Sequence, residues 1–344
     1  MPTSTNARTL YAQLMDDSDF LSQLTGIPSR EVLVTEIQKY GKARGLCVSV
    51  EDIRQVMTSP ERELSDQELE AVIGGKVCSI GDNTVFGGDD DVLIDDYFFG
   101  SNYLEGGAGH DTLFGLNGDD SMQGGDGHDD LYGGSGNDTM YGGLKHADSE
   151  DGSCQSDYMD GGSGNDMMYG GSGFDTMIGG LGNDTMDGGS QEDTMSGGSG
   201  SDIMYGGSGD DIMNGDAGDD IMNGGSHNDT MSGGAGNDYM DGGSWDDTMT
   251  GGDGNDTMHG GSGNDLLTGG AGSDVFVFGA NEGSDTITDF TPGTDTFEFS
   301  GLSQSDLKVA TNNGNTILSF NGTTVTLEGV EMTADEVWAC RNTD

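Results

Sequence analysis

The feature that most constrains this chain is a nine-residue repeat, whose first unit begins at Gly106 and whose last begins at Gly269. Each unit follows the pattern Gly-Gly-x-Gly-x-Asp-x-U-x, where U is a large apolar residue, and residues 161–169 show the pattern unchanged. Eighteen units occur, and the last thirteen are uninterrupted. Self-similarity at a fixed short period indicates a solenoid, in which each unit contacts mainly its neighbours.

The sixth position of the repeat is Asp in every unit, which compositional bias alone would not produce. Carboxylate oxygens are the ligands that the hard cation Ca²⁺ prefers. Gly at positions one, two and four is expected to allow positive φ and to let the backbone turn its carbonyl groups inward. The candidate metal ligands are therefore Asp111, Asp120, Asp129, Asp138, Asp157, Asp166, Asp175, Asp184, Asp193, Asp202, Asp211, Asp220, Asp229, Asp238, Asp247, Asp256, Asp265 and Asp274.

This pattern resembles the RTX, or hemolysin-type, calcium-binding nonapeptide repeat. The resemblance implies an all-β fold, a right-handed parallel β-roll in which two units make one turn and U points inward from a short strand. It also implies Ca²⁺ ions between successive turns at each edge, each bridging the Asp of one turn to that of the next. The uninterrupted block then offers about eleven sites, so we expect roughly ten Ca²⁺ ions.

Composition also indicates that a cation is needed. The chain has 63 acidic and 11 basic side chains, a formal charge of −52, and only 31% hydrophobic residues. Such a chain has too little apolar material for a conventional core, and an Asp-rich disordered chain is the alternative to a metal-bound roll. The charge excludes nucleic acid as a partner, and no apolar run is long enough for a transmembrane segment.

The inward position U is Met in fourteen units. Because Met is unbranched and adaptable, we expect this row to fill a thin core. A thioether row that binds soft Cu(I) or scavenges oxidants is the alternative.

One edge of the expected roll departs from the pattern. Position four is Gln191, His227 and Trp245 in units whose starts differ by multiples of eighteen residues, so these side chains should share an edge, together with Phe174. We hypothesise that the other edge is a tight Ca²⁺ spine, whereas this one offers Phe174, His227 and Trp245 as a contact patch. Chance variation is the alternative. The five His residues, including His259, show no metal-ligand spacing beyond the repeat and are expected in solvated loops.

Residues 1–75 predict a small α-helical domain, with Ser65 and Glu68 placed to form a capping box before Gly74 and Gly75. Residues 63–75 resemble the end of double-glycine leader peptides of the nif-associated and nitrile-hydratase-like type. The resemblance implies that a peptidase-containing ABC exporter cuts after Gly75. A retained helical domain is the alternative.

The rest of the chain divides by pattern. Residues 76–105 are expected to form a degenerate N-terminal cap, and 106–274 the roll, with an insertion at about 144–153 that leaves the stack intact. Residues 275–344 are expected to form a β-rich C-terminal cap that covers the last turn. They resemble the segment that follows RTX arrays, which implies a type I secretion signal and leaves open which export signal is used. Strands are expected at 275–278, 285–290, 296–299, 316–320 and 323–327.

The sequence holds no His-Glu-x-x-His, Gly-x-Ser-x-Gly or phosphate-loop motif, so we expect no enzyme activity. We expect a secreted Ca²⁺-binding β-roll that folds on Ca²⁺ binding outside the cell. Its expected role is structural or in contact with an unknown extracellular or surface partner. One alternative is a modified-peptide or bacteriocin-like precursor. Another is an ice-binding solenoid that uses an outward threonine row, which Ile212 interrupts: Thr176, Thr194, Thr230 and Thr248.

Overall fold

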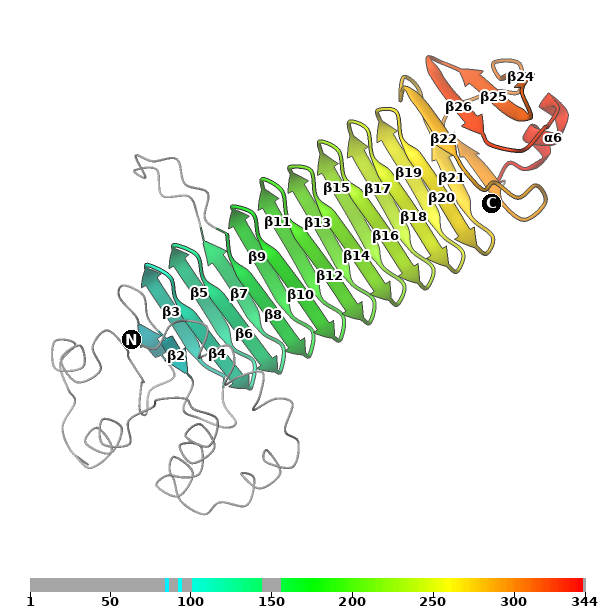
Figure 1. Cartoon of the computed structure of the whole chain (residues 1–344). Helices are drawn as coiled ribbons and strands as arrows, with labels where there is room; N and C mark the ends of the chain where they lie inside the picture. The colour runs from blue at the N-terminus through cyan, green and yellow to red at the C-terminus, as the bar shows by residue number, and fades with distance from the viewer. Residues whose placement is uncertain (1–83, 87–91, 95–100, 144–155, 343–344) are drawn as a thin grey trace, which may run out of the picture.

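The structure is a computed structural model that describes residues 84–86, 92–94, 101–143 and 156–342 (Figure 1). The expected leader, with its cleavage site at Gly74 and Gly75, lies outside the described residues.

The described residues form strands almost throughout. The strands are β1 (Thr84–Phe86), β2 (Val92–Ile94), β3 (Tyr103–Ala108), β4 (Thr112–Asn117), β5 (Ser121–Asp126), β6 (Asp130–Ser135), β7 (Thr139–Gly143), β8 (Tyr158–Ser163), β9 (Met167–Ser172), β10 (Thr176–Leu181), β11 (Thr185–Ser190), β12 (Thr194–Ser199), β13 (Ile203–Ser208), β14 (Ile212–Ala217), β15 (Ile221–Ser226), β16 (Thr230–Ala235), β17 (Tyr239–Ser244), β18 (Thr248–Asp253), β19 (Thr257–Ser262), β20 (Leu266–Ala271), β21 (Val275–Phe278), β22 (Ser284–Ile287), β23 (Thr296–Phe299), β24 (Lys308–Asn312), β25 (Asn315–Phe320) and β26 (Thr323–Leu327). One short helix, α6 (Ala334–Ala339), follows them.

Successive strands alternate between two facing sheets. Odd-numbered strands from β1 to β23 form one sheet, here called the odd sheet. Even-numbered strands from β2 to β22, joined by β26, β25 and β24, form the other, here called the even sheet. Two nine-residue units therefore complete each turn of a right-handed parallel β-solenoid of about ten turns, which confirms the predicted fold class. Figure 1 shows the resulting rod.

The insertion after β7 does not disturb the stack. Strand β6 pairs with β8, and β7 with β9, in the same parallel register as the uninterrupted turns. The prediction that the insertion leaves the roll intact is thus confirmed.

The core of the roll is a double row of U side chains. In most repeat strands the second and fourth residues point inward, and these are U and the position-one Gly. Every U side chain from Leu113 to Phe276 is at most 1% exposed, and each stacks on its equivalent one turn away, as Met177 does on Met195. The predicted role of the Met row as core filler is confirmed.

The C-terminal part, here called the cap, comprises β22 to β26 and α6. Strands β22 and β23 continue the two parallel sheets, whereas β24, β25 and β26 form an antiparallel meander that joins β22 through β26. The five strands expected after residue 274 are present. Strand β24 and helix α6 were not expected, although Thr333 and Glu336 form a capping box at the start of that helix.

No helix in the described part of the chain is long and apolar enough to cross a membrane.

Candidate metal centre

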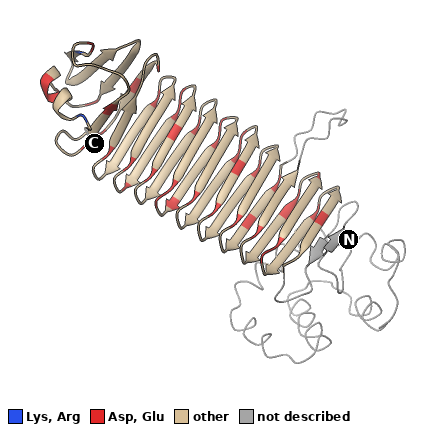
Figure 2. Ribbon diagram, turned by 180° about the vertical axis from the view of Figure 1, so that it is seen from behind, with Lys and Arg blue, Asp and Glu red and all other residues tan. Residues whose placement is uncertain are grey.

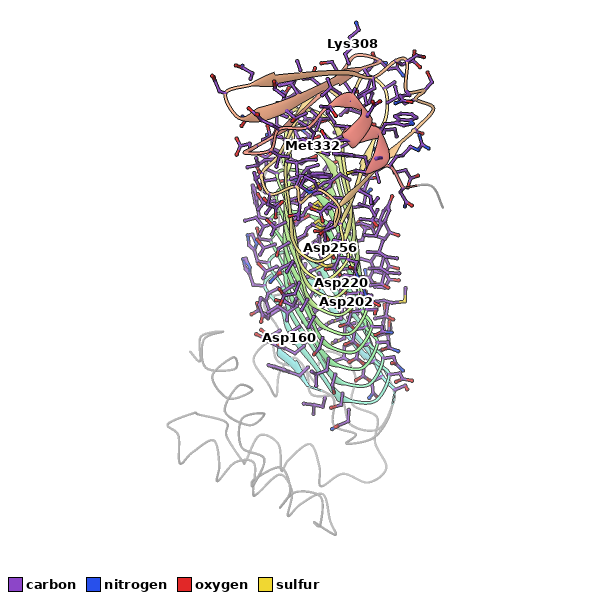
Figure 3. All side chains as sticks on the ribbon, turned by 90° about the vertical axis from the view of Figure 1, so that its right-hand side faces the viewer. Asp160, Asp202, Asp220, Asp256, Lys308 and Met332 are labelled. Atoms are coloured by element: carbon purple, nitrogen blue, oxygen red, sulfur yellow. The ribbon has the colours of Figure 1, made fainter. Side chains whose placement is uncertain are left out.

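The Asp residues at position six form two columns, one in each row of turns between the sheets. The first column lies in the turns from the odd to the even sheet and contains Asp111, Asp129, Asp157, Asp175, Asp193, Asp211, Asp229, Asp247 and Asp265. The second column lies in the opposite turns and contains Asp120, Asp138, Asp166, Asp184, Asp202, Asp220, Asp238, Asp256 and Asp274. All eighteen are at most 2% exposed, and Figure 3 shows Asp202, Asp220 and Asp256 following one another along the roll.

Hydrogen bonds link each column into a ladder. The backbone N–H of each Asp donates to Oδ1 of the Asp one turn later, over 2.6 to 3.0 Å. The ladder crosses the insertion, because Asp129 N–H donates to Asp157 Oδ1 and Asp138 N–H to Asp166 Oδ1. One carboxylate oxygen of each residue after the first turn is therefore used to hold successive turns together.

The second carboxylate oxygen has no partner. In seventeen of the eighteen Asp residues, Oδ2 is buried and makes no hydrogen bond. A buried, unpaired carboxylate oxygen costs several kcal/mol unless a proton or a cation satisfies it. In nearly every unit the ladder thus leaves the Oδ2 atom as an acceptor, which a positive ion would satisfy.

The position-one Gly makes room for this oxygen. A Cβ added to Gly179 would lie 2.5 Å from Asp184 Oδ2 and 2.5 Å from the carbonyl oxygen of Gly197. Positive φ occurs at positions two and four, as at Gly180 and Gly182, but not at position one. The expectation that Gly at position one is needed for positive φ is therefore wrong. Gly is needed at position one because a larger side chain would collide with the Asp carboxylate and with a carbonyl oxygen.

Positions two and four bring backbone oxygens to the edges. A Cβ on Gly180 or Gly182 would collide with the carbonyl oxygen of the equivalent residue one turn earlier. At position one a carbonyl oxygen also lies beside a carboxylate, because Gly197 O and Asp184 Oδ2 are both 2.5 Å from the same point at Gly179. Carboxylate and carbonyl oxygens together are the donor set of a Ca²⁺ site. Within the described residues, no three His, Cys, Asp or Glu side chains gather closely enough to hold a metal by themselves. A cation in a column would draw on two carboxylates and on these carbonyl groups.

The buried carboxyl groups have raised pKa values. Burial raises the pKa of Asp157, Asp193 and Asp247 to about 8, with neighbouring carboxylates of the same column adding to the effect. Burial likewise raises the pKa of Asp129 and Asp220 to about 7. Packing the columns without a cation therefore favours protonated carboxyl groups.

A second ladder, at position five, was not predicted. The backbone N–H of Asn183 donates to Asn165 Oδ1, and that of Asn255 to Asn237 Oδ1, so these side chains accept from the following turn. This direction is opposite to that of the position-six ladder. The frequent Asn and Asp at position five could have indicated this ladder from the sequence, because their side chains readily bond to backbone groups.

The candidate contact patch consists of two separate parts. His227 and Trp245 stack with ring centroids 5.6 Å apart, and Trp245 is 60% exposed. Both residues adopt positive φ, as does Gln191 in the same row of turns. Phe174, 47% exposed, lies four turns from Trp245, or about 19 Å at the usual strand spacing. That Phe174, His227 and Trp245 contact a partner stays a prediction.

The outward threonine row lies in one column of the even sheet. Thr176 pairs with Thr194, and Thr230 with Thr248, but Ile212 stands between the two pairs and is 54% exposed. An interrupted row is a poorer template for ordered water, so ice binding is not favoured.

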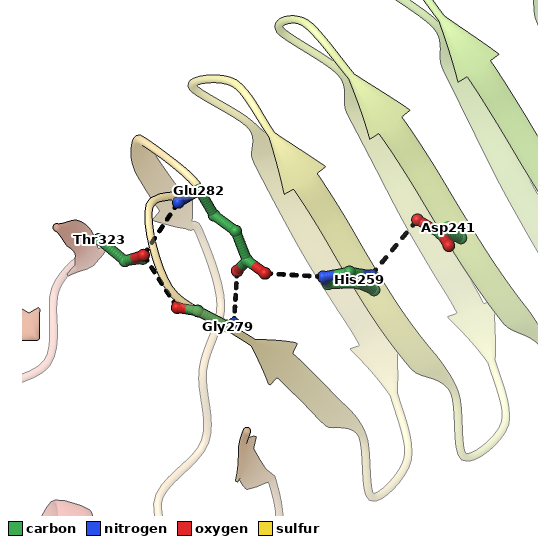
Figure 4. Close-up of polar contacts among 5 residues, drawn as sticks. All are labelled: Asp241, His259, Gly279, Glu282 and Thr323. Atoms are coloured by element: carbon green, nitrogen blue, oxygen red, sulfur yellow. Dashed lines mark hydrogen bonds and ion pairs between the residues drawn. The ribbon is translucent and has the colours of Figure 1, made fainter. Parts of the chain in front are cut away.

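His259 is not in a solvated loop, and that expectation is wrong. It lies in β19, where Nδ1 is 3.3 Å from Asp241 Oδ1 and Nε2 is 3.0 Å from Glu282 Oε1 (Figure 4). Hydrogen bonds to these two carboxylates raise the pKa of His259 to about 10. Glu282 also accepts from Gly279 N–H, and its own N–H donates to Thr323 Oγ1, so the cluster ties the roll to the cap.

A family model described as RTX calcium-binding nonapeptide repeat (4 copies) matches the chain in nine overlapping segments, which together span residues 96–144 and 160–287. No curated protein matches. Among solved structures, the AlgE6R3 subunit of the Azotobacter vinelandii mannuronan C5-epimerase is 24% identical, with a TM-score of 0.21 over 44% of this chain and 76% of that one. The extracellular lipase LipA of Serratia marcescens is 17% identical, with a TM-score of 0.21 over 72% of this chain and 44% of that one. Neither superposition is close enough to indicate what this chain does.

Proposed function

This chain belongs to the family of RTX calcium-binding nonapeptide repeat proteins, and we propose that it is exported unfolded and folds outside the cell when Ca²⁺ fills its two aspartate columns. The observation that carries this proposal is the set of seventeen buried Oδ2 atoms without a partner. In each site, the carboxylates of two Asp residues one turn apart and nearby Gly carbonyl groups hold the ion. Bound Ca²⁺ supplies positive charge between like-charged turns.

The columns offer more sites than the sequence estimate of roughly ten. That estimate counted only the uninterrupted block, whereas the hydrogen-bond ladder continues across the insertion. Nine Asp residues in each column make eight neighbouring pairs, so the two columns offer sixteen sites. Sixteen divalent ions carry 32 positive charges, against a net charge of −47 for residues 76–344.

Charge explains why Ca²⁺ acts as a folding trigger. The only Lys and Arg of the described residues are Lys308 and Arg341, both in the cap (Figure 2). No Lys or Arg is therefore available along the described turns of the roll to offset the columns. When a site forms only in the folded state, the free energy of ion binding contributes directly to folding.

The export route in this proposal rests on the double-glycine motif. We assign processing after Gly75 to a peptidase-containing ABC exporter, which leaves a chain that begins at Lys76. Edman sequencing or mass spectrometry of the secreted protein tests this step, and an intact N-terminus would contradict it. A short secreted peptide would instead support the precursor alternative.

The proposed role outside the cell is structural or in contact with a partner, without catalysis. Support comes from the absence of a catalytic motif in the sequence and from the exposed aromatic side chains of Phe174 and Trp245. Aromatic side chains are favoured anchors at protein interfaces.

Far-UV circular dichroism of the full chain tests the folding step. We expect a cooperative coil-to-β transition on titration with Ca²⁺ and none with Mg²⁺, which prefers a rigid octahedron with retained waters. As a residue-level control, Asp211→Asn should remove ligands from the first column, whereas Asp210→Asn changes an exposed neighbour. An equal response to both metals, or equal behaviour of both variants, would contradict the proposal.

A further inference from the structure

The first column does not end with the repeat. The N–H of Asp265, its last repeat residue, donates over 3.2 Å to Oδ1 of Asp285 in β22 of the cap. Asp285 is 2% exposed and lies twenty residues after Asp265, so it falls outside the nine-residue period. The cap thus supplies one more carboxylate in the position that the next repeat would have filled.

The pair at this junction includes a buried oxygen without a hydrogen-bond partner. Asp265 Oδ2 is buried and has no hydrogen-bond partner. Its carboxyl group is close enough to that of Asp285 for the two to interact directly. Two buried carboxyl groups in contact require a shared proton or a cation, since both cannot stay charged alone.

The second column ends differently. Asp295 also accepts from the last repeat residue, Asp274, at 3.2 Å, but its Oδ2 accepts from Thr291 N–H. Both oxygens of Asp295 therefore have partners, and the buried oxygen without a partner at this end of the roll belongs to Asp265 of the first column.

The strand ladder is short at the same junction. Strand β22 matches β20 at only two positions, Leu266 with Thr286 and Leu267 with Ile287. Strands of the uninterrupted roll, such as β18 and β20, match at five. The N–H groups of Ser284 and Thr288 also donate to the carbonyl oxygens of Gly263 and Leu267, so backbone bonds and the Asp265–Asp285 contact together attach β22 to the even sheet.

We propose that Asp265 and Asp285 hold a divalent cation between the roll and the cap, so that ion binding docks β22 onto the last turn. This inference rests on the proposed function, because the ion is of the same class as that in the columns. It adds one site that a count of repeat units does not include.

The test compares four full-length proteins: wild type, Asp285→Asn, Asp211→Asn and Asp246→Asn. The Asn at 285 keeps an acceptor for Asp265 N–H but removes the charge. Asp211 lies within the first column and reports on the proposed function. Asp246 is an exposed position-five residue in the same row of turns, where neighbouring turns carry Asn228 and Asn264, so its variant is the matched control.

Equilibrium dialysis with Ca²⁺ counts the ions, and hydrogen exchange of β22 reports on docking. We expect Asp285→Asn to bind one ion fewer than Asp246→Asn. We also expect the Ca²⁺ concentration that half-protects β22 to rise about tenfold. If the pair were only a repulsive contact, removing its charge would instead leave the ion count unchanged and protect β22 better.

The remaining outcomes separate the two proposals. Loss of an ion in Asp211→Asn but not in Asp285→Asn would overturn the junction site alone, whereas no loss in either would overturn both. If Asp285→Asn fails to fold in Ca²⁺, the variant Asp285→Glu is measured instead, because it restores the charge. Recovery of folding and ion count supports the site, and failure of both variants shows that Asp285 is only a packing residue and overturns the site.

Discussion

Gly at position one and Asp at position six act together within each unit. The Gly faces the interior without a side chain, and the Asp carboxylate of the same unit occupies the space beside it. A methyl group there would displace both the carboxylate and a carbonyl oxygen of the next turn.

We therefore predict that Gly179→Ala lowers the free energy of unfolding in Ca²⁺ by about 1–3 kcal/mol and raises the Ca²⁺ midpoint of folding. Circular dichroism measures both quantities. Ser199→Ala, at an exposed position of a neighbouring strand, is the control and should change neither. Equal behaviour of the two variants would show that the space beside Gly179 is not needed.

The Met row gives a second prediction for single residues. Met222 is fully buried between identical neighbours, Met204 and Met240. Met222→Ala should lower the free energy of unfolding by about 2–5 kcal/mol through cavity formation, whereas Met222→Leu should cost less than about 1.5 kcal/mol. Thermal unfolding in saturating Ca²⁺ checks this, and a neutral Ala variant would mean that the core is not close-packed.

At the residue level, the environment of a side chain could be predicted from the sequence where the residue recurs at the nine-residue period. Asp at position six and Met at U recur every nine residues, so their burial in columns could be expected. The environment of His259 could not, because Glu282 comes from a non-repeating segment and meets it only after the cap docks.

The two columns, taken as elements, lead to a prediction about pH. In the Ca²⁺-free roll, burial raises carboxyl pKa values to between about 6 and about 8, above the ordinary value of 3.8. The folded state then binds more protons than the unfolded state, so stability rises as pH falls through this range and is lost as pH rises through it. We expect chelator-treated protein to gain β signal in circular dichroism between about pH 8 and pH 5.

Protons and Ca²⁺ should compete for the same oxygens. Because protons also stabilise the folded roll, the Ca²⁺ midpoint of folding is expected to decrease as pH falls from 7.5 to 5.5, whereas the apparent Ca²⁺ affinity of the folded roll weakens; both are measured on the same protein. A metal-free β signal that grew with rising pH would contradict this account of the columns.

The link between β19 and the cap gives a second prediction for elements. The pKa of His259 is raised to about 10, so its ion pairs contribute fully below about pH 6.5 and are lost as pH rises through about 10. His259→Gln should weaken docking of the cap by about 1 kcal/mol, seen as faster hydrogen exchange in β22 and β26. His227→Gln, at an exposed His, should leave hydrogen exchange in β22 and β26 unchanged. Equal exchange in the His259 and His227 variants would show that the His259 ion pairs do not stabilise the docked cap.

Among the elements, those outside the period were hardest to predict. Helix α6 is only six residues long, and β24 lacks a clear alternation of buried and exposed residues. Asp285 was missed because it follows Asp265 by twenty residues rather than eighteen. Such elements are specified by tertiary packing, which a single sequence shows only weakly.

The whole molecule is built in steps of one turn, and this predicts how it tolerates deletion. Removing residues 197–214 takes out one full turn and joins β12 to β14 in the same sheet, so the roll should fold with two fewer Ca²⁺ ions. Removing residues 197–205 moves every later unit to the opposite sheet and presents β22 to the wrong one. Circular dichroism and equilibrium dialysis compare the two, and equal folding would show that the sheets are interchangeable.

The direction of the aspartate ladder makes the two ends of the roll chemically different. Each Asp donates its amide to the following turn and offers Oδ1 to the preceding one. A roll that simply stopped would expose amides at one end and carboxylates at the other, and these surfaces fit each other. Copies would then add head to tail into open-ended fibres. By placing Asp285 and Asp295 on the last amides, the cap occupies the donors that such head-to-tail addition would need.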